Sequence, residues 1–209
     1  MSQSLNVPGI FYYPRMLFNP ALMIPHIMVR SIADINPSRL KNAGIQAVAV
    51  DKDNTLTDPY SSTFNPLVEE AVEHFRDFFG RDFAIVSNDA GTPDDSEHSK
   101  ADMLEDELDI PVIHHRAKKP SCGADLLRYF GCRYDEIAVI GDRVSTDIAL
   151  GNRHGMLTIL TQPFTSKGDN LMAKVLRPIE RRVVEGLMSA GLSAPYNKRN
   201  LGADVLSLP

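Results

Sequence analysis

Two aspartates stand two residues apart at the end of an apolar run, an arrangement that can support chemistry. The run Val48–Val50 leads directly into Asp51, and Asp53 follows within a short polar stretch. On an extended chain, side chains alternate between two faces, so both carboxylates point to the same side. Carboxylates this close repel each other unless a cation or a shared proton offsets the repulsion. The spacing therefore predicts a cation-dependent reactive site, and a solvated acidic turn is the alternative.

A second pair of carboxylates follows another apolar run later in the chain. The run Ile137–Ile140 ends in a turn at Gly141, which is followed by Asp142 and, five residues further on, by Asp147. Glycine has no side chain, so the backbone at Gly141 can approach a bound metal closely. Helix capping would explain Asp142 alone. It does not explain two acidic motifs that both end apolar runs.

Small polar residues and a basic run lie between the two acidic motifs. The apolar run Phe83–Val86 ends at Ser87 and Asn88, and a later basic run contains Lys118 and Lys119 before a proline. The hydroxyl of Ser87 can donate a hydrogen bond to a phosphoryl oxygen without adding bulk. A lysine carries a point charge on a flexible stem, which suits it to steady a carboxylate or phosphate. A solvated edge is the alternative for the basic run.

The elements that must position these residues alternate between strand and helix patterns. This alternation predicts an α/β fold with a Rossmann-like, doubly wound parallel sheet, and it places each motif at the C-terminal end of a strand. The predicted strands are Ile45–Val50, Phe83–Ser87, Pro111–His114, Glu136–Gly141 and Met156–Leu160. The predicted helices are Pro37–Gly44, Asn65–Phe79, Lys100–Leu108, Ser121–Phe130 and Ile148–His154.

The motifs, taken in this order, resemble those of the haloacid dehalogenase (HAD) superfamily phosphatases. Asp51-Lys52-Asp53-Asn54-Thr55 is similar to the first motif, Asp-x-Asp-x-Thr, and the segment 141–147 is similar to the fourth. The resemblance implies that Asp51 attacks phosphorus and forms an aspartyl-phosphate. It also implies that Asp53 protonates the leaving oxygen and then activates water.

The same resemblance implies a Mg²⁺ ion and a set of phosphate ligands. Its metal ligands would be Asp51, the backbone carbonyl of Asp53 and Asp142, while Asp147 would act through a water or orient its neighbours. A metal is needed because a phosphate dianion repels a carboxylate nucleophile. The implied phosphate-binding residues are Ser87, Asn88 and Lys119, with Lys118 as the second choice for the lysine.

The gaps between motifs indicate a capless member of the superfamily. Members often insert a cap domain after the first motif or between the second and third motifs. Here the stretch from Thr57 to Phe83 has room for a flap and one helix, and the stretch from Ser87 to Lys119 for a loop, one helix and one strand. A capless site implies a large or surface-bound substrate, because its mouth stays open.

A narrower resemblance covers roughly residues 10–165. Phe18-Asn19-Pro20, Lys118–Gly123 and Gly141–Ile148 are similar to the mitochondrial HAD-type phosphatidylglycerophosphatases of fungi and plants. That family implies hydrolysis of phosphatidylglycerophosphate to phosphatidylglycerol, a step toward cardiolipin, by a peripheral protein on the matrix face of the inner mitochondrial membrane. A soluble capless phosphatase for phosphoproteins or small phosphate esters and a non-catalytic membrane scaffold are the alternatives. The intact set of reactive residues argues against a scaffold.

The two ends of the chain differ from its centre in charge. The net charge of −5 over 209 residues divides into +3 over residues 1–44, −11 over 45–170 and +3 over 171–209. So acidic a centre argues against binding to nucleic acid. Basic ends suit contact with an anionic surface, although simply solvated charges are the alternative.

Both ends also carry apolar segments, which flank a predicted phosphatase core at residues 45–168. In residues 1–44, the segment Phe11–Arg30 is apolar and aromatic, and in residues 169–209, Leu171–Met188 has an apolar stripe. We expect each segment to contact an anionic membrane surface or a second copy of the chain, and the basic residues of the C-terminal segment to decorate its surface. A strap packed across the domain is the alternative for the N-terminal segment, and a helix packed on the domain is the alternative for the C-terminal segment. These basic residues are Lys174, Arg177, Arg181 and Arg182.

Overall fold

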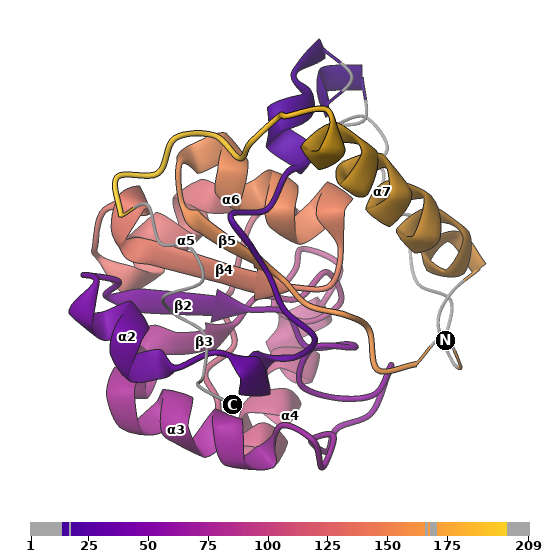
Figure 1. The fold of residues 1–209 in the computed structure, drawn as a ribbon. Helices are drawn as coiled ribbons and strands as arrows, with labels where there is room; N and C mark the ends of the chain where they lie inside the picture. Colours follow the sequence, from indigo (N-terminus) through magenta and orange to yellow (C-terminus); the bar gives the residue numbers. More distant parts are fainter. Residues whose placement is uncertain (1–13, 17, 166, 168–170, 200–209) are drawn as a thin grey trace.

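The computed structural model describes residues 14–16, 18–165, 167 and 171–199, and for residues 171–173 it describes the backbone only. Five parallel strands form one sheet in the order β1-β5-β4-β2-β3 (Figure 1). This confirms the predicted α/β fold with a parallel sheet. The strands are β1 (Ile27–Met28), β2 (Ala47–Val50), β3 (Phe83–Ile85), β4 (Ile137–Gly141) and β5 (Leu157–Leu160).

Helices cover both faces of the sheet because each central strand is apolar on both sides. Val48 and Val50 of β2 pack with helices α3 and α4, whereas Ala47 and Ala49 pack with α5 and α6. The α-helices are α2 (Pro37–Asn42), α3 (Glu69–Phe79), α4 (Ser99–Leu108), α5 (Gly123–Phe130), α6 (Ala149–His154) and α7 (Leu171–Ser189). The short helical turns are η1 (Pro20–Met23), η2 (Ile32–Asp34), η3 (Gly80–Asp82), η4 (Ser96–His98), η5 (Tyr134–Glu136) and the π-helical η6 (Val144–Ile148).

Two predicted elements differ from those observed. The helix expected from Asn65 begins at Glu69, because the Asn65 side chain accepts from the backbone of Leu67 and holds a turn there. The strand expected at Pro111–His114 is reduced to a single bridge between Val112 and Ile85. The first difference lies at the start of a helix, where a side-chain hydrogen bond competes with regular structure.

The N-terminal segment is fastened to the core. β1 pairs in parallel with β5 at its outer edge, and the side-chain amide of Asn152 on α6 donates to the carbonyls of Leu22 and Ile24 at 3.0 and 2.8 Å. Side chains buried in the protein cannot enter a membrane, so the expected membrane contact is wrong for residues 23–29, which form the strap. Residues 11–13 and 17 of the expected contact lie outside the described residues. The buried apolar side chains of the strap are Met23, Ile24, Ile27 and Val29.

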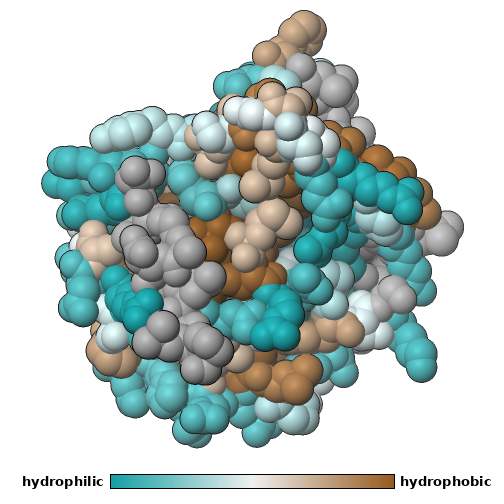
Figure 2. Space-filling model, viewed as in Figure 1, coloured by the Kyte–Doolittle hydropathy of each residue, from teal (hydrophilic) through white to brown (hydrophobic). Residues whose placement is uncertain are grey.

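Helix α7 lies beside the two helical layers, next to η6 and the N-terminal segment (Figure 1). Its Val184 packs against Met16, Val144 and Leu160. The helix continues through Pro178. Apolar residues follow the outer side of α7 (Figure 2). Within the described ranges, no helix combines the length and apolar character needed to span a bilayer.

Candidate active site

The predicted motifs meet at the C-terminal edge of the sheet. Asp51 directly follows β2, Ser87 comes two residues after β3, and Asp142 directly follows β4. The backbone N–H of Asp51 donates to the carbonyl of Ile140 at 2.8 Å, which joins the ends of β2 and β4. Parallel strands end at one edge of a sheet, so residues distant in sequence become neighbours there.

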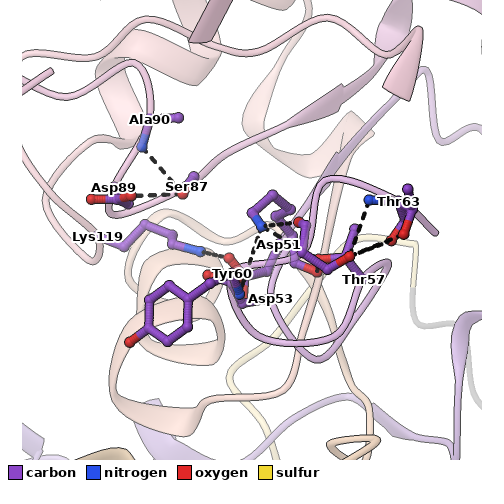
Figure 3. Close-up of polar contacts among 11 residues, drawn as sticks. Asp51, Asp53, Thr57, Tyr60, Thr63, Ser87, Asp89, Ala90 and Lys119 are labelled. Atoms are coloured by element: carbon purple, nitrogen blue, oxygen red, sulfur yellow. Dashed lines mark hydrogen bonds and ion pairs between the residues drawn. The ribbon is translucent and has the colours of Figure 1, made fainter. Parts of the chain in front are cut away.

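Lys119 links two of the aspartates. Its Nζ lies 2.6 Å from Asp51 Oδ1 (Figure 3). The same buried atom lies 2.6 Å from Asp147 Oδ1. Burial by itself lowers the pKa of the Lys119 ammonium, but Asp147 and Asp51 outweigh that effect, and the pKa is raised above its ordinary value. Lys119 therefore stays charged between the carboxylates. Lys118 instead pairs with Asp94 at 2.7 Å, so the structure brings Lys119 rather than Lys118 to the motif.

Ser87 and Asn88 shape the loop that leaves β3. The Ser87 hydroxyl accepts hydrogen bonds from the backbone N–H groups of Asp89 and Ala90, at 3.1 and 3.4 Å (Figure 3). The Asn88 side-chain oxygen accepts from the backbone N–H of Lys119 at 2.8 Å. Asn88 was predicted to bind phosphate, and in this structure it positions the backbone of Lys119.

Three buried carboxylates form a compact cluster. One oxygen from each of Asp51, Asp142 and Asp147 lies within 4.8 Å of the others. Burial raises the pKa of Asp142 to about 8, although the charge of Arg177 opposes the shift. Burial likewise raises the pKa of Asp147, and Lys119 opposes it. Arg177 and Lys119 thus do not fully offset the cost of burying these carboxylates in their ionised form.

This donor set fits a hard divalent cation. Carboxylate oxygens are the ligands that Mg²⁺ and Ca²⁺ prefer. In the part of the chain that the structure describes, the buried Oδ1 of Asp142 has no hydrogen-bond partner, which leaves it available as a ligand. Asp147 is anchored by the backbone N–H of Arg143 and the hydroxyl of Thr146, both at 3.2 Å from Oδ2. The predicted ligation by the backbone carbonyl of Asp53 stays a prediction.

Gly141 is required for a reason that the sequence did not reveal. A Cβ atom at this position would lie 2.4 Å from the carboxyl carbon of Asp147, which is closer than real side chains approach. The absent side chain therefore makes room for Asp147 against the end of β4. The close approach of the Gly141 backbone to a metal stays a prediction.

Asp53 is held apart from the three-carboxylate cluster. Its Oδ1 accepts from the backbone N–H of Tyr60 at 2.9 Å and pairs with Lys52 Nζ at 2.7 Å. Lys52 is buried and also donates to the carbonyl of Ser61 at 2.8 Å. Lys52 therefore joins Asp53 to the flap that follows, and sequence reasoning missed it because a lysine between two motif positions is expected to point away from the site.

Arg177 of α7 also reaches the site, which corrects its expected place on an outer surface. Its Nε lies 2.6 Å from Asp142 Oδ2, and its side chain is only 12% exposed. The neighbouring Arg182 is exposed, as predicted. Nothing in the local sequence separates Arg177 from the other basic residues of α7, so only the packing of the helix reveals its role.

Comparison with known proteins places the chain in a family. The sequence profile described as mitochondrial PGP phosphatase matches residues 7–165. Phosphatidylglycerophosphate phosphatase 1, chloroplastic/mitochondrial, of Arabidopsis thaliana is 36% identical over 195 residues, which cover 92% of this chain but only 56% of that relative. Phosphatidylglycerophosphate phosphatase 1, chloroplastic, of Chlamydomonas reinhardtii is 36% identical over 198 residues, covering 93% of this chain and 74% of that relative. Phosphatidylglycerophosphatase GEP4, mitochondrial, of Saccharomyces cerevisiae is 36% identical over 157 residues, covering 72% of this chain and 84% of that relative. The chain belongs to the mitochondrial PGP phosphatase family.

Proposed function

We propose that this chain is a divalent-cation-dependent phosphatase that hydrolyses phosphatidylglycerophosphate to phosphatidylglycerol and phosphate, a step toward cardiolipin. The names of the three relatives support this substrate. The observation that carries the proposal is the buried pairing of Lys119 with Asp51, beside the carboxylates of Asp142 and Asp147. Such a cluster is costly to keep in a fold unless it binds a cation and does chemistry.

Asp51 is the proposed nucleophile. One of its carboxylate oxygens attacks phosphorus and forms an acyl phosphate, while the bond between phosphorus and the ester oxygen breaks. Lys119 holds Oδ1 of Asp51 at 2.6 Å, so the carboxylate is oriented before the substrate arrives. The hydroxyl of Ser87 and the amide NH₂ of Asn88 are the proposed donors to phosphoryl oxygens.

Asp53 is the proposed general acid and base. In its protonated form it gives a proton to the leaving ester oxygen. In its ionised form it then takes a proton from the water that attacks the acyl phosphate and releases phosphate. The backbone N–H of Tyr60 and the ammonium of Lys52 fix its carboxyl group at the rim of the site.

Mg²⁺ is the proposed cofactor. Asp51, Asp142 and the backbone carbonyl of Asp53 would hold it, and Asp147 would act through a water or orient its neighbours. The ion would shield the nucleophile from the charge of the phosphate dianion.

The outer face of α7 favours a lipid substrate over a soluble one. Val175, Ile179 and Val183 lie four residues apart on this helix and are 53%, 52% and 41% exposed. Lys174 and Arg182 are exposed beside them. An apolar stripe with basic neighbours suits the surface of an anionic bilayer. We propose peripheral contact there, on the matrix face of the inner mitochondrial membrane, and a second copy of the chain is the competing occupant.

The test is phosphate release from phosphatidylglycerophosphate, a phosphoprotein and a soluble aryl phosphate, with Mg²⁺ and with excess chelator. We expect the lipid to be preferred and the chelator to stop turnover. Asp51→Asn should remove turnover, because an amide forms no acyl phosphate. Asp53→Asn should slow it by about 10²–10⁴-fold.

Two outcomes would contradict the proposal. Activity that persists in excess chelator would exclude the cation, and substantial turnover by Asp51→Asn would exclude the nucleophile. A preference for the phosphoprotein or the aryl phosphate would favour the soluble alternative. Lys118→Gln is the matched control for Lys119→Gln, since only Lys119 contacts Asp51.

A further inference from the structure

Helix α7 turns one basic side chain inward while its apolar stripe faces outward. Arg177 projects from the inner side of the helix, and its Nε contacts Asp142 Oδ2 at 2.6 Å. The Asp142 side chain is fully buried, and one of its oxygens lies within 4.8 Å of an oxygen of the nucleophile Asp51. The guanidinium group is thus a neighbour of the reacting carboxylate, although it comes from a separate helix.

Two lysines at the site also pair with carboxylates. Lys119 is shared between Asp51 and Asp147, and Lys52 is paired with Asp53. Arg177 is paired with Asp142, which like Asp51 is a proposed ligand of the divalent cation. If Asp142 binds the cation, its negative charge is offset and it attracts the guanidinium of Arg177 less. The guanidinium would then lie next to the phosphoryl group that Asp51 attacks.

The charge of Arg177 also acts on the flap that carries Tyr60. Burial raises the pKa of the Tyr60 hydroxyl, Asp53 and Asp89 raise it further, and Arg143 and Arg177 oppose the shift. A guanidinium can offer two parallel N–H groups to a phosphate, which a lysine cannot do.

We propose that Arg177 is a substrate-binding residue of this site. It pairs with Asp142 before cation and substrate bind, and it donates hydrogen bonds to the phosphoryl group afterwards. α7 thereby completes the phosphate site at the edge of the sheet. The inner face of the helix contacts the phosphate, and its outer face is directed toward the lipid. This inference rests on the proposed function, because it assumes that a phosphate enters beside Asp51.

The first test measures the binding of inorganic phosphate by calorimetry in metal-free buffer, so it needs no turnover. Asp142→Asn removes the carboxyl group that pairs with Arg177. We expect this variant to bind phosphate about 10- to 100-fold more tightly than Asp142→Asn/Arg177→Gln, as charge-assisted hydrogen bonds predict. Asp142→Asn/Arg182→Gln is the control and should keep the affinity of Asp142→Asn, because Arg182 is exposed on the same helix.

The comparison separates binding from a structural role. An arginine with a purely structural role donates no hydrogen bond to phosphate, so equal phosphate affinities of the single and double variants would overturn the proposal. If a chain binds phosphate through Arg177 but hydrolyses no phosphatidylglycerophosphate, the proposed function fails and this inference stands.

The second test uses the unmodified chain and is independent of the folding of any variant. Phenylglyoxal labels arginine side chains, and mass spectrometry reports the extent at each site. With Mg²⁺ present, inorganic phosphate should protect Arg177 from the reagent and leave Arg182 unaffected. Labelling of Arg177 that phosphate does not reduce would count against the contact.

Discussion

The N-terminal strap and helix α7 have similar compositions, but the apolar side chains of the strap are buried and those on the outer face of α7 are exposed. Both are rich in apolar residues with basic neighbours, and both lie against the same side of the core. In the strap, Ile24 is 1% exposed, whereas on α7 Ile179 is 52% exposed. Composition alone therefore does not decide whether an apolar segment belongs to the core or to a surface.

The difference follows from backbone hydrogen bonds. The strap cannot satisfy its own N–H and C=O groups, so it takes partners from the open edge of β5 and from Asn152 on α6. A helix satisfies its backbone internally and can rest on the core through few side chains, here Val184 and Arg177. The rest of its apolar surface then remains available to a partner.

The largest expected effect is a difference in the free energy of unfolding between a variant of the strap and a variant of α7. Ile24→Ala should lower the free energy of unfolding by about 2–5 kcal/mol, because it leaves a cavity in a buried site. Ile179→Ala, the same change on α7, should lower it by less than about 0.5 kcal/mol. Denaturant unfolding of both variants checks this contrast, and equal losses would mean that α7 is as deeply packed as the strap.

A smaller effect should follow from the side chain that ties the strap to α6. Asn152→Ala should cost about 1–3 kcal/mol, because the carbonyls of Leu22 and Ile24 lose a donor in a buried place. Asn42→Ala on the exposed side of α2 is the control. Thermal unfolding measures both. A neutral Asn152→Ala would show that the strap is held by strand pairing alone.

The next prediction concerns the membrane face of α7. Ile179→Glu should weaken binding to anionic vesicles by about 10-fold, because an apolar contact is lost and a repelling charge is gained. Hydrolysis of a soluble aryl phosphate should not change. Ile179→Leu should bind vesicles as the original chain does. If Ile179→Glu instead changes the association state of the chain, the stripe is a subunit contact.

The smallest effect tests the charge beside the stripe. Arg182→Gln should cost about 1 kcal/mol of vesicle binding, and added salt should reduce this difference. Arg81→Gln, an exposed arginine on η3 and away from α7, is the control. Cosedimentation at two ionic strengths measures both variants. A salt-independent loss would point to a packing role for Arg182.

Sequence alone determined four of the five strands in the described sheet and most of the reactive residues, because their signals are local. A buried parallel strand is a short apolar run, and the polar residues that follow it stand at the edge of the sheet wherever the helices pack. Asp51, Ser87, Asp142 and Asp147 could therefore be placed from the residues around them. The Lys-Pro pair likewise drew attention to Lys119.

Tertiary structure decided which of several similar side chains enters the site. Lys118 and Lys119 differ by one position, and Arg177 differs little from the other arginines of its helix. The distances to Asp51 and Asp142 separate them only after the loop and α7 have docked on the core. The same holds for the strap, because its burial depends on the edge of β5, which the chain forms more than a hundred residues later. These features depend on contacts between distant segments, and no local pattern records such contacts.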